Sequence, residues 1–162
     1  MIAVYGTELL EWVENIADGW KRLIAAHPEI LEFPCDIRET KSVAQLLQHL
    51  VAAELRYAER LNGLAETPYE SVPYDSGEVI YKTHDRAMDL LRTILNRDEA
   101  FWEAELEFRT RSAGTLHATR RTVFVHLLTH SVRHYAQLAT LTRKQGVAPD
   151  FPMDYLLMGV RR

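Results

Sequence analysis

Four long stretches of the chain carry apolar residues at spacings of three and four positions, and this periodicity constrains the fold more than any other feature. Residues at such spacings lie on one side of an α-helix, which has about 3.6 residues per turn. The stretches run from about Glu8 to Ala26, from near Ser42 to just before Gly63, from about Gly77 to Asn96, and from near Thr119 to Gly146. The pattern therefore predicts an all-α fold in which four helices of similar length pack side by side.

Local signals indicate where these helices begin and end. Thr7 is placed to cap the first helix, and Ser42 can form a capping box with Gln45 at the start of the second. Gly146 follows two basic residues and suits the left-handed position that ends a helix. We expect the C-terminal segment beyond Gly146, which contains two prolines and then an apolar cluster, to lie across the helices.

A short β-hairpin is predicted between the third and fourth helices. The first of two segments there alternates with polar positions, a Ser-Ala-Gly turn follows, and the second segment continues the alternation. The alternating positions are Leu106, Phe108 and Thr110, and then Thr115, His117 and Thr119.

The composition is that of an ordinary globular protein. The chain has 162 residues, a formal net charge of −4, 47% hydrophobic and 26% charged residues, which suits a single domain spanning residues 1–162. Cys35 is the only cysteine, so the sequence has neither a disulfide framework nor a cysteine-rich zinc site.

Charge and hydropathy bear on partners and location. No segment is dominated by basic residues, which argues against nucleic acid as the main partner. No apolar run reaches the roughly 20 residues needed to cross a bilayer, and the N-terminal segment is acidic where a signal peptide is basic. We therefore expect a cytoplasmic protein without a membrane partner.

Three histidines recur every four residues in the fourth predicted helix, at His126, His130 and His134. On a helix each is rotated by only about 40° from the previous one, so the imidazoles form a row. The row borders apolar positions and is expected to face inward, where imidazoles without partners would be costly. Two of them can reach the same metal ion, and the alternative is that they pack in the core with hydrogen bonds to backbone or hydroxyl groups.

His49 is a candidate for a further ligand. It lies midway along the second predicted helix between apolar residues, a position more typical of a core residue than of a ligand. The histidine pair on the fourth helix is what favours ligation. Three histidines with an open fourth position are typical of a catalytic or exchangeable metal ion. Because ligating imidazoles must be neutral, we expect metal affinity to fall steeply below their reference pKa of about 6.5.

Missing motifs narrow the chemistry. The sequence has no His-Glu-x-x-His motif of zinc peptidases and no Glu-x-x-His motif of di-iron carboxylate bundles. It also has no glycine-rich phosphate loop, nucleophile elbow or Cys-His pair.

Two segments resemble the DinB-like superfamily, which includes the YfiT-like proteins. LLQHLVAAELRYAERL is similar to the second helix of this family, and FVHLLTHSVRHYAQLATLTRKQG is similar to its His-x-x-x-His helix that ends at glycine. Many members have Arg-Gly-Gln after the last histidine, where this chain has Tyr135, Ala136 and Gln137 and retains the glutamine alone.

The resemblance implies an up-down-down-up four-helix bundle, usually a homodimer, that binds one divalent ion, zinc or nickel. Carried over residue by residue, the ligands are His49, His130 and His134, whereas His126 matches a histidine that is not consistently a ligand. Some relatives transfer low-molecular-weight thiols such as bacillithiol or mycothiol, and one group isomerises maleylpyruvate.

The function predicted from this resemblance is a metal-dependent thiol S-transferase with a small-molecule thiol and an electrophilic substrate as partners. One alternative is a non-catalytic metal-binding stress-response protein, and another is a helical dimerisation module whose histidines only pack.

Several further residues have predicted roles. His126, Gln137 and Tyr57 are expected to surround the metal or line its pocket. His84 is predicted to be a core histidine with a hydrogen-bond partner, or otherwise to contact a ligand, and the tryptophans are predicted to pack in the core. A cluster of arginines is either a solvated rim or a site for a carboxylate of the substrate: Arg109, Arg111, Arg120 and Arg121.

Overall fold

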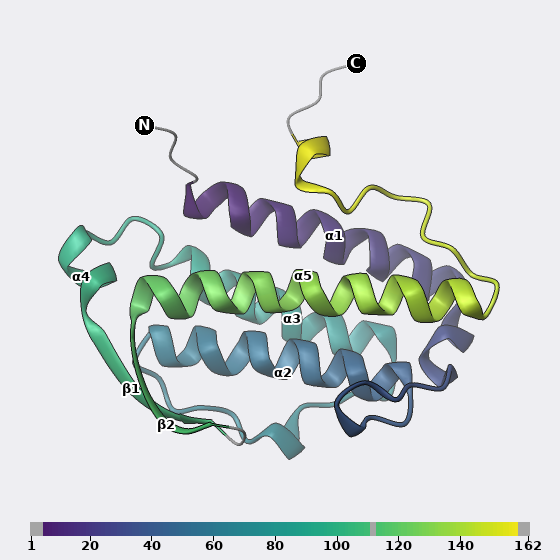
Figure 1. Cartoon of the computed structure of the whole chain (residues 1–162), viewed down its shortest axis with the longest axis horizontal. Helices are drawn as coiled ribbons and strands as arrows, with labels where there is room; N and C mark the ends of the chain where they lie inside the picture. Colours follow the sequence, from purple (N-terminus) through teal and green to yellow (C-terminus); the bar gives the residue numbers. More distant parts are fainter. Residues whose placement is uncertain (1–4, 111–112, 159–162) are drawn as a thin grey trace.

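The computed structural model describes residues 5–110 and 113–158, and this part of the chain is mostly helical, as predicted (Figure 1). The four long helices are α1 (Gly6–Ala26), α2 (Val43–Leu61), α3 (Gly77–Arg92) and α5 (Arg120–Lys144). Helix α1 packs against α3 and α5, and α2 packs against the same two helices. The four helices thus surround a shared interior.

The apolar faces predicted from the periodicity fill this interior. One cluster of buried side chains includes Trp20, Leu47 and Tyr135, and a second includes Leu55 and Leu127. Burying a large apolar side chain stabilises the fold by about 1.5–3 kcal/mol, so these two clusters are the main force that holds α2 against α5.

The predicted start and end of α5 are confirmed, and the capping box at the start of α2 is present in modified form. Ser42 Oγ accepts a hydrogen bond from the backbone N–H of Gln45, at 3.4 Å, as the capping box predicts. The side chain of Gln45, however, accepts from the backbone N–H of Lys41 instead of Ser42. Thr119 caps α5, and Gly146 has the expected left-handed conformation with φ of +84°.

The predicted cap at Thr7 is wrong, because α1 begins at Gly6 and Tyr5 occupies the cap position. There the carboxylate of Glu8 accepts a hydrogen bond from the backbone N–H of Tyr5 at 3.1 Å.

The predicted end of the third helix, at Asn96, is also wrong, because α3 ends at Arg92. The side chains of Asn62 and Thr93 both donate to the carbonyl of Leu90, at 3.0 and 2.7 Å. That carbonyl would otherwise accept the next hydrogen bond of the helix, so these contacts end it early.

The predicted hairpin is present as β1 (Glu105–Thr110) and β2 (Gly114–Thr119), which pair in antiparallel register. The turn residues Arg111 and Ser112 lie outside the described residues. A short helix, α4 (Glu99–Glu103), precedes the hairpin and was not predicted. Asp98 caps α4 by accepting a hydrogen bond from the backbone N–H of Phe101, and its five residues are too few to show a periodicity.

Short 3-10 helices form parts of the connections and of the C-terminal segment: η1 (Pro28–Glu32), η2 (Ile37–Glu39), η3 (Tyr69–Ser71) and η4 (Tyr155–Met158). The C-terminal segment returns along α1, where Trp12 donates a hydrogen bond to the carbonyl of Met153 at 2.8 Å. This confirms that it lies across the helices (Figure 1). Among the described residues, no helix is long and apolar enough to cross a membrane.

Candidate metal centre

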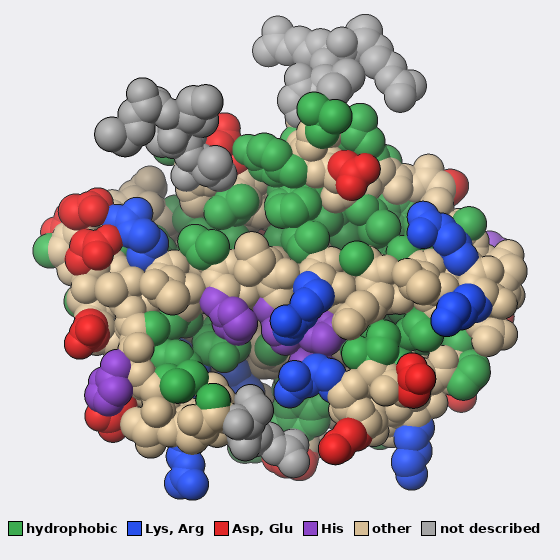
Figure 2. Space-filling model, in the orientation of Figure 1, with side chains coloured by type: hydrophobic (Ala, Val, Ile, Leu, Met, Phe, Trp, Pro, Cys, Tyr) green, Lys and Arg blue, Asp and Glu red, His purple; other side chains and the backbone are tan. Residues whose placement is uncertain are grey.

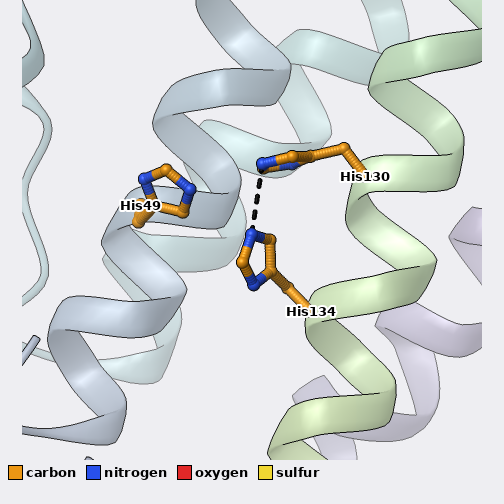
Figure 3. A group of neighbouring side chains, drawn as sticks. All are labelled: His49, His130 and His134. Atoms are coloured by element: carbon orange, nitrogen blue, oxygen red, sulfur yellow. Dashed lines mark hydrogen bonds between the residues drawn. The ribbon is translucent and has the colours of Figure 1, made fainter. Parts of the chain in front are cut away.

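Helices α2 and α5 bring three histidines together. His130 and His134 lie one turn apart on α5, and His49 faces them from α2 (Figure 3). One ring nitrogen from each histidine can be chosen so that all three nitrogens lie within 4.8 Å of one another. The structure therefore brings together the three residues that the sequence analysis proposed as ligands.

The distances within the group suit a shared ion. The ring centroid of His49 lies 5.2 Å from that of His130 and 4.9 Å from that of His134. The Nε2 atoms of His130 and His134 are 3.1 Å apart. Nitrogens bound at 2.0–2.1 Å to a tetrahedral ion lie about 3.3–3.4 Å from each other, so this pair is close to the spacing that such an ion needs.

Burial leaves parts of these rings without hydrogen-bond partners. His134 is 1% exposed and His130 is 9% exposed, and His49 is partly buried. Within the described part of the chain, His49 Nε2 and His130 Nδ1 are buried and make no hydrogen bond. A buried polar atom without a partner costs about 1–3 kcal/mol, and a metal ion would compensate this cost at a nitrogen that it binds. The donor set and its burial thus fit a metal ion.

The ring of His134 is held in one tautomer by Gln137. Because an amide oxygen can only accept, His134 Nδ1 donates to Gln137 Oε1, at 2.7 Å. The Nε2 atom of His134 faces His130, and in this tautomer it keeps its lone pair.

All three imidazoles are neutral at pH 7. Burial, reinforced by the charges of neighbouring groups, lowers the pKa of His49 to about 4, that of His134 to about 4 and that of His130 to about 2. Arg133 adds to all three shifts, because its positive charge disfavours a second positive charge nearby. Neutral imidazole is the form that binds metal ions.

The donor set limits the choice of ion. Among the described residues, neither a carboxylate nor the thiol of Cys35 joins the three histidines. Imidazole nitrogen suits zinc, nickel, copper and iron, and three protein ligands leave a position open for water or substrate.

A cleft of about 770 Å³ opens beside the histidine group. In Figure 2, histidine side chains lie in a hollow below α5, next to Lys and Arg side chains. The lining includes His49, His130, His126, Tyr57 and Tyr69. A volume of this size is typical of sites for small molecules.

His126 and Tyr57 face the cleft without joining the histidine group. The ring centroid of His126 lies 5.8 Å from that of His130 and 5.7 Å from that of Tyr57. Both residues line the cleft, whereas Gln137 hydrogen-bonds to His134.

His84 is a core residue and lies outside the site. It is 3% exposed, and its Nδ1 lies 2.7 Å from a carboxylate oxygen of Glu54. Tyr135, which follows the last histidine, is fully buried and stacks on Trp20 with ring centroids 6.4 Å apart. Both contribute to packing, and Trp20 is buried in the core as predicted, while Trp12 and Trp102 are partly buried against it.

The arginines of the predicted cluster divide between the two alternatives, a solvated rim and a substrate site. Arg109 lines the cleft, but Arg121 pairs with Glu99 and Glu103, and the guanidinium of Arg120 lies over the ring of Phe101. All of these partners belong to the short helix α4, so both arginines make their contacts outside the cleft. The fourth member of the cluster, Arg111, lies outside the described residues.

Two arginines beside the histidines were missed in the sequence, Arg38 and Arg133. Arg133 carried a signal, because it lies between His130 and His134 on the same helix. Arg38 carried none, because it precedes the predicted second helix in an irregular segment.

Comparison with known protein families matches residues 2–159 to the DinB family. The match covers nearly the whole chain, including all three histidines. No curated protein matches the chain.

Proposed function

The chain belongs to the DinB family, and from this membership and the site geometry we propose that it binds one divalent metal ion through His49, His130 and His134. The observation that carries the proposal is the group of three imidazoles, neutral at pH 7, in which His49 Nε2 and His130 Nδ1 are buried and make no hydrogen bond with a described residue. Zinc and nickel are the ions that we expect, because both accept imidazole ligands. The family also supports an up-down-down-up order of the four long helices and a homodimer.

The reaction that we propose is the transfer of a low-molecular-weight thiol to an electrophilic carbon. A bound divalent ion with an open position lowers the pKa of a thiol, so that thiolate is present at neutral pH. In the reaction the thiol sulfur forms a bond to the electrophilic carbon. The leaving group departs with its bonding electron pair, and the thiol proton goes to solvent.

The histidines, the residues of the cleft and the buried cysteine are all compatible with this reaction. The three histidines are kept neutral by burial, and Gln137 fixes the ring of His134. The cleft places His126 and Tyr57 where they can contact a small molecule. Cys35 is buried and accepts a hydrogen bond from Thr40 at 3.0 Å, so its thiol is not the expected nucleophile. A single buried thiol also fits a reducing cytoplasm.

The experiment pairs bacillithiol, mycothiol, glutathione and cysteine with monochlorobimane or chlorodinitrobenzene. Metal-loaded protein should consume the electrophile faster than the chelated protein with at least one of these thiols. His49→Ala should lower the rate by orders of magnitude, and Cys35→Ser should leave it unchanged. If no thiol shows a metal-dependent rate, the transferase proposal fails, and a metal-binding protein without turnover becomes the better account.

A further inference from the structure

We propose that the cleft beside His49 and His130 accepts a small organic molecule with carboxylate groups, which Arg38, Arg109 and Arg133 bind. The proposal rests on the proposed function, since the molecule would be the thiol or the electrophile of that reaction. It assigns a substrate class and three binding residues.

The charge of the cleft differs from that of the whole chain. The chain has a net charge of −4, whereas the described lining of the cleft includes five arginines and one carboxylate, that of Glu39. Positive side chains that line one cleft raise the local concentration of anions and favour their binding.

Two of the five arginines already have partners. Arg56 and Arg60 both donate to the carboxylate of Glu66, at 2.9 and 2.6 Å. The guanidinium of Arg60 also lies over the rings of Tyr57 and Phe108, 4.8 and 4.5 Å from their centroids. These contacts hold Arg56 and Arg60 in the wall of the cleft.

The other three arginines are available for a ligand. Arg38, Arg109 and Arg133 come from η2, β1 and α5, and none forms an ion pair with a described residue. All three are exposed and line the same cleft. Three guanidinium groups that line one cleft and have no counter-ion among the described residues would be stabilised by an anion bound there.

The backbone at Arg38 is strained. Arg38 and the following Glu39 both have left-handed conformations, with φ of +52° and +63°, although neither is glycine. Such conformations are unfavourable for residues other than glycine and are concentrated at functional sites. Here the strained turn brings Arg38 to the edge of the cleft, close enough for its charge to lower the pKa of His49 and of His134.

Arg133 gives the anion a position next to the proposed metal ion. It lies between His130 and His134 on α5, and its charge lowers the pKa of both. A carboxylate held by Arg133 would thus keep the rest of the molecule beside the histidines.

The lining favours carboxylates on an organic molecule. The planar guanidinium fork matches a carboxylate, and the sequence has no glycine-rich loop of the kind that binds phosphate. The side chains of Tyr57, Tyr69 and Leu116 add aromatic and apolar surface to the cleft.

The test measures binding to the metal-free protein, so it does not depend on activity. Calorimetric titrations at low ionic strength use succinate, citrate, the neutral diamide succinamide and glycerol phosphate. The variants are the double substitution Arg38→Gln/Arg133→Gln and the control Arg121→Gln, which removes an arginine that lies outside the cleft and pairs with Glu99 and Glu103. Metal content and thiol transfer are measured separately on the same preparations.

Succinate or citrate should bind the wild-type protein and the Arg121→Gln control, and succinamide should not. Each lost charged hydrogen bond lowers affinity about tenfold or more, so the double variant should bind at least tenfold more weakly. Added salt should weaken binding to the wild type.

Three results would overturn the inference: no carboxylate binding to the wild type, equal binding to the double variant, or tighter binding of glycerol phosphate than of the carboxylates. Arginine-dependent binding by a protein that takes up no divalent ion even after incubation with zinc or nickel would instead refute the proposed function and leave the carboxylate site standing.

Discussion

The imidazole of His134 shows how one hydrogen bond prepares a ligand. Gln137 accepts from Nδ1 and leaves the lone pair of Nε2 facing His130. Such partners orient the ring and increase its basicity as a ligand.

Replacing Gln137 should therefore weaken metal binding without removing a ligand. We expect Gln137→Leu to lower metal affinity by about 10–100-fold, measured by competition with a chromophoric chelator. Gln137→Glu keeps an acceptor and should retain most of the affinity, and Gln145→Leu, at the exposed end of α5, is the matched control. Wild-type affinity in Gln137→Leu would show that the hydrogen bond does not prepare the site.

The lowered pKa values change the expected pH dependence. The sequence predicted that affinity falls below about pH 6.5, the reference pKa of histidine. In the structure the pKa of His49 and of His134 is about 4 and that of His130 is about 2, so protons compete with the metal only at lower pH. We expect nearly constant affinity between pH 7 and about 5 and a steep fall near about pH 4, measured by competition titrations. A steep fall already between about pH 6.5 and 5.5 would contradict these pKa shifts.

The buried carboxylate of Glu54 connects three helices, α2, α3 and α5, through hydrogen bonds. Glu54 on α2 is 1% exposed and accepts a hydrogen bond from Ser131 on α5 at 2.7 Å. Its other oxygen lies 2.7 Å from Nδ1 of His84 on α3. Because Ser131 follows His130 directly, this contact helps to fix α2 and α5 at the distance that brings His49 to its partners.

Removing this carboxylate should destabilise the fold strongly. Burial opposes protonation of His84, but the charge of Glu54 raises its pKa, so the two form a buried ion pair when the imidazole is protonated. Deleting one partner of such a pair costs about 3–5 kcal/mol, so we expect Glu54→Ala to lower the free energy of unfolding by this amount. The control is Asp85→Ala, which removes an exposed ion pair with Lys21 and should cost about 0–1 kcal/mol. Denaturant unfolding measures both, and similar losses in the two variants would refute the role of Glu54.

The long helices could be predicted from the sequence, because a helix that buries one face has apolar residues every three or four positions. This periodicity predicted the end of α3 wrongly, because that end depends on a contact from Asn62, which directly follows α2 and is distant in sequence. Short α4 also escaped prediction, and with it the acidic partners of Arg121.

The histidine group was predictable because two of its members lie one turn apart on a helix, and the family resemblance added His49. The arginines of the cleft were harder to predict. The position of Arg38 follows from a strained turn, and local sequence patterns indicate such turns mainly through glycine.

At the scale of the whole molecule, one apolar surface has no partner in the described chain. Tyr5 is 65% exposed and Leu156 is 77% exposed, and η4 carries further exposed apolar side chains. Tyr155 of η4 packs on Trp12 of α1, so this surface is continuous with that helix, and Figure 2 shows apolar side chains gathered there. Apolar patches of this kind are typical of protein interfaces.

We expect this surface to form the homodimer interface. Light scattering at micromolar concentration should give twice the chain mass of 18.7 kDa. Leu156→Glu should shift the protein towards the monomer, because burying an unpaired charge in the interface is costly. A wild-type monomer, or a dimer that tolerates Leu156→Glu, would contradict this interface.

The metal content of protein purified without an affinity tag tests the central claim most directly. Elemental analysis should find about one divalent ion per chain in the wild type and in His117→Ala, whose histidine is exposed on β2 away from the site. The double variant His130→Ala/His134→Ala should contain none, because it loses two of three ligands. Full metal occupancy in the double variant, or a wild type that binds no divalent ion even after incubation with zinc or nickel, would contradict the three-histidine site.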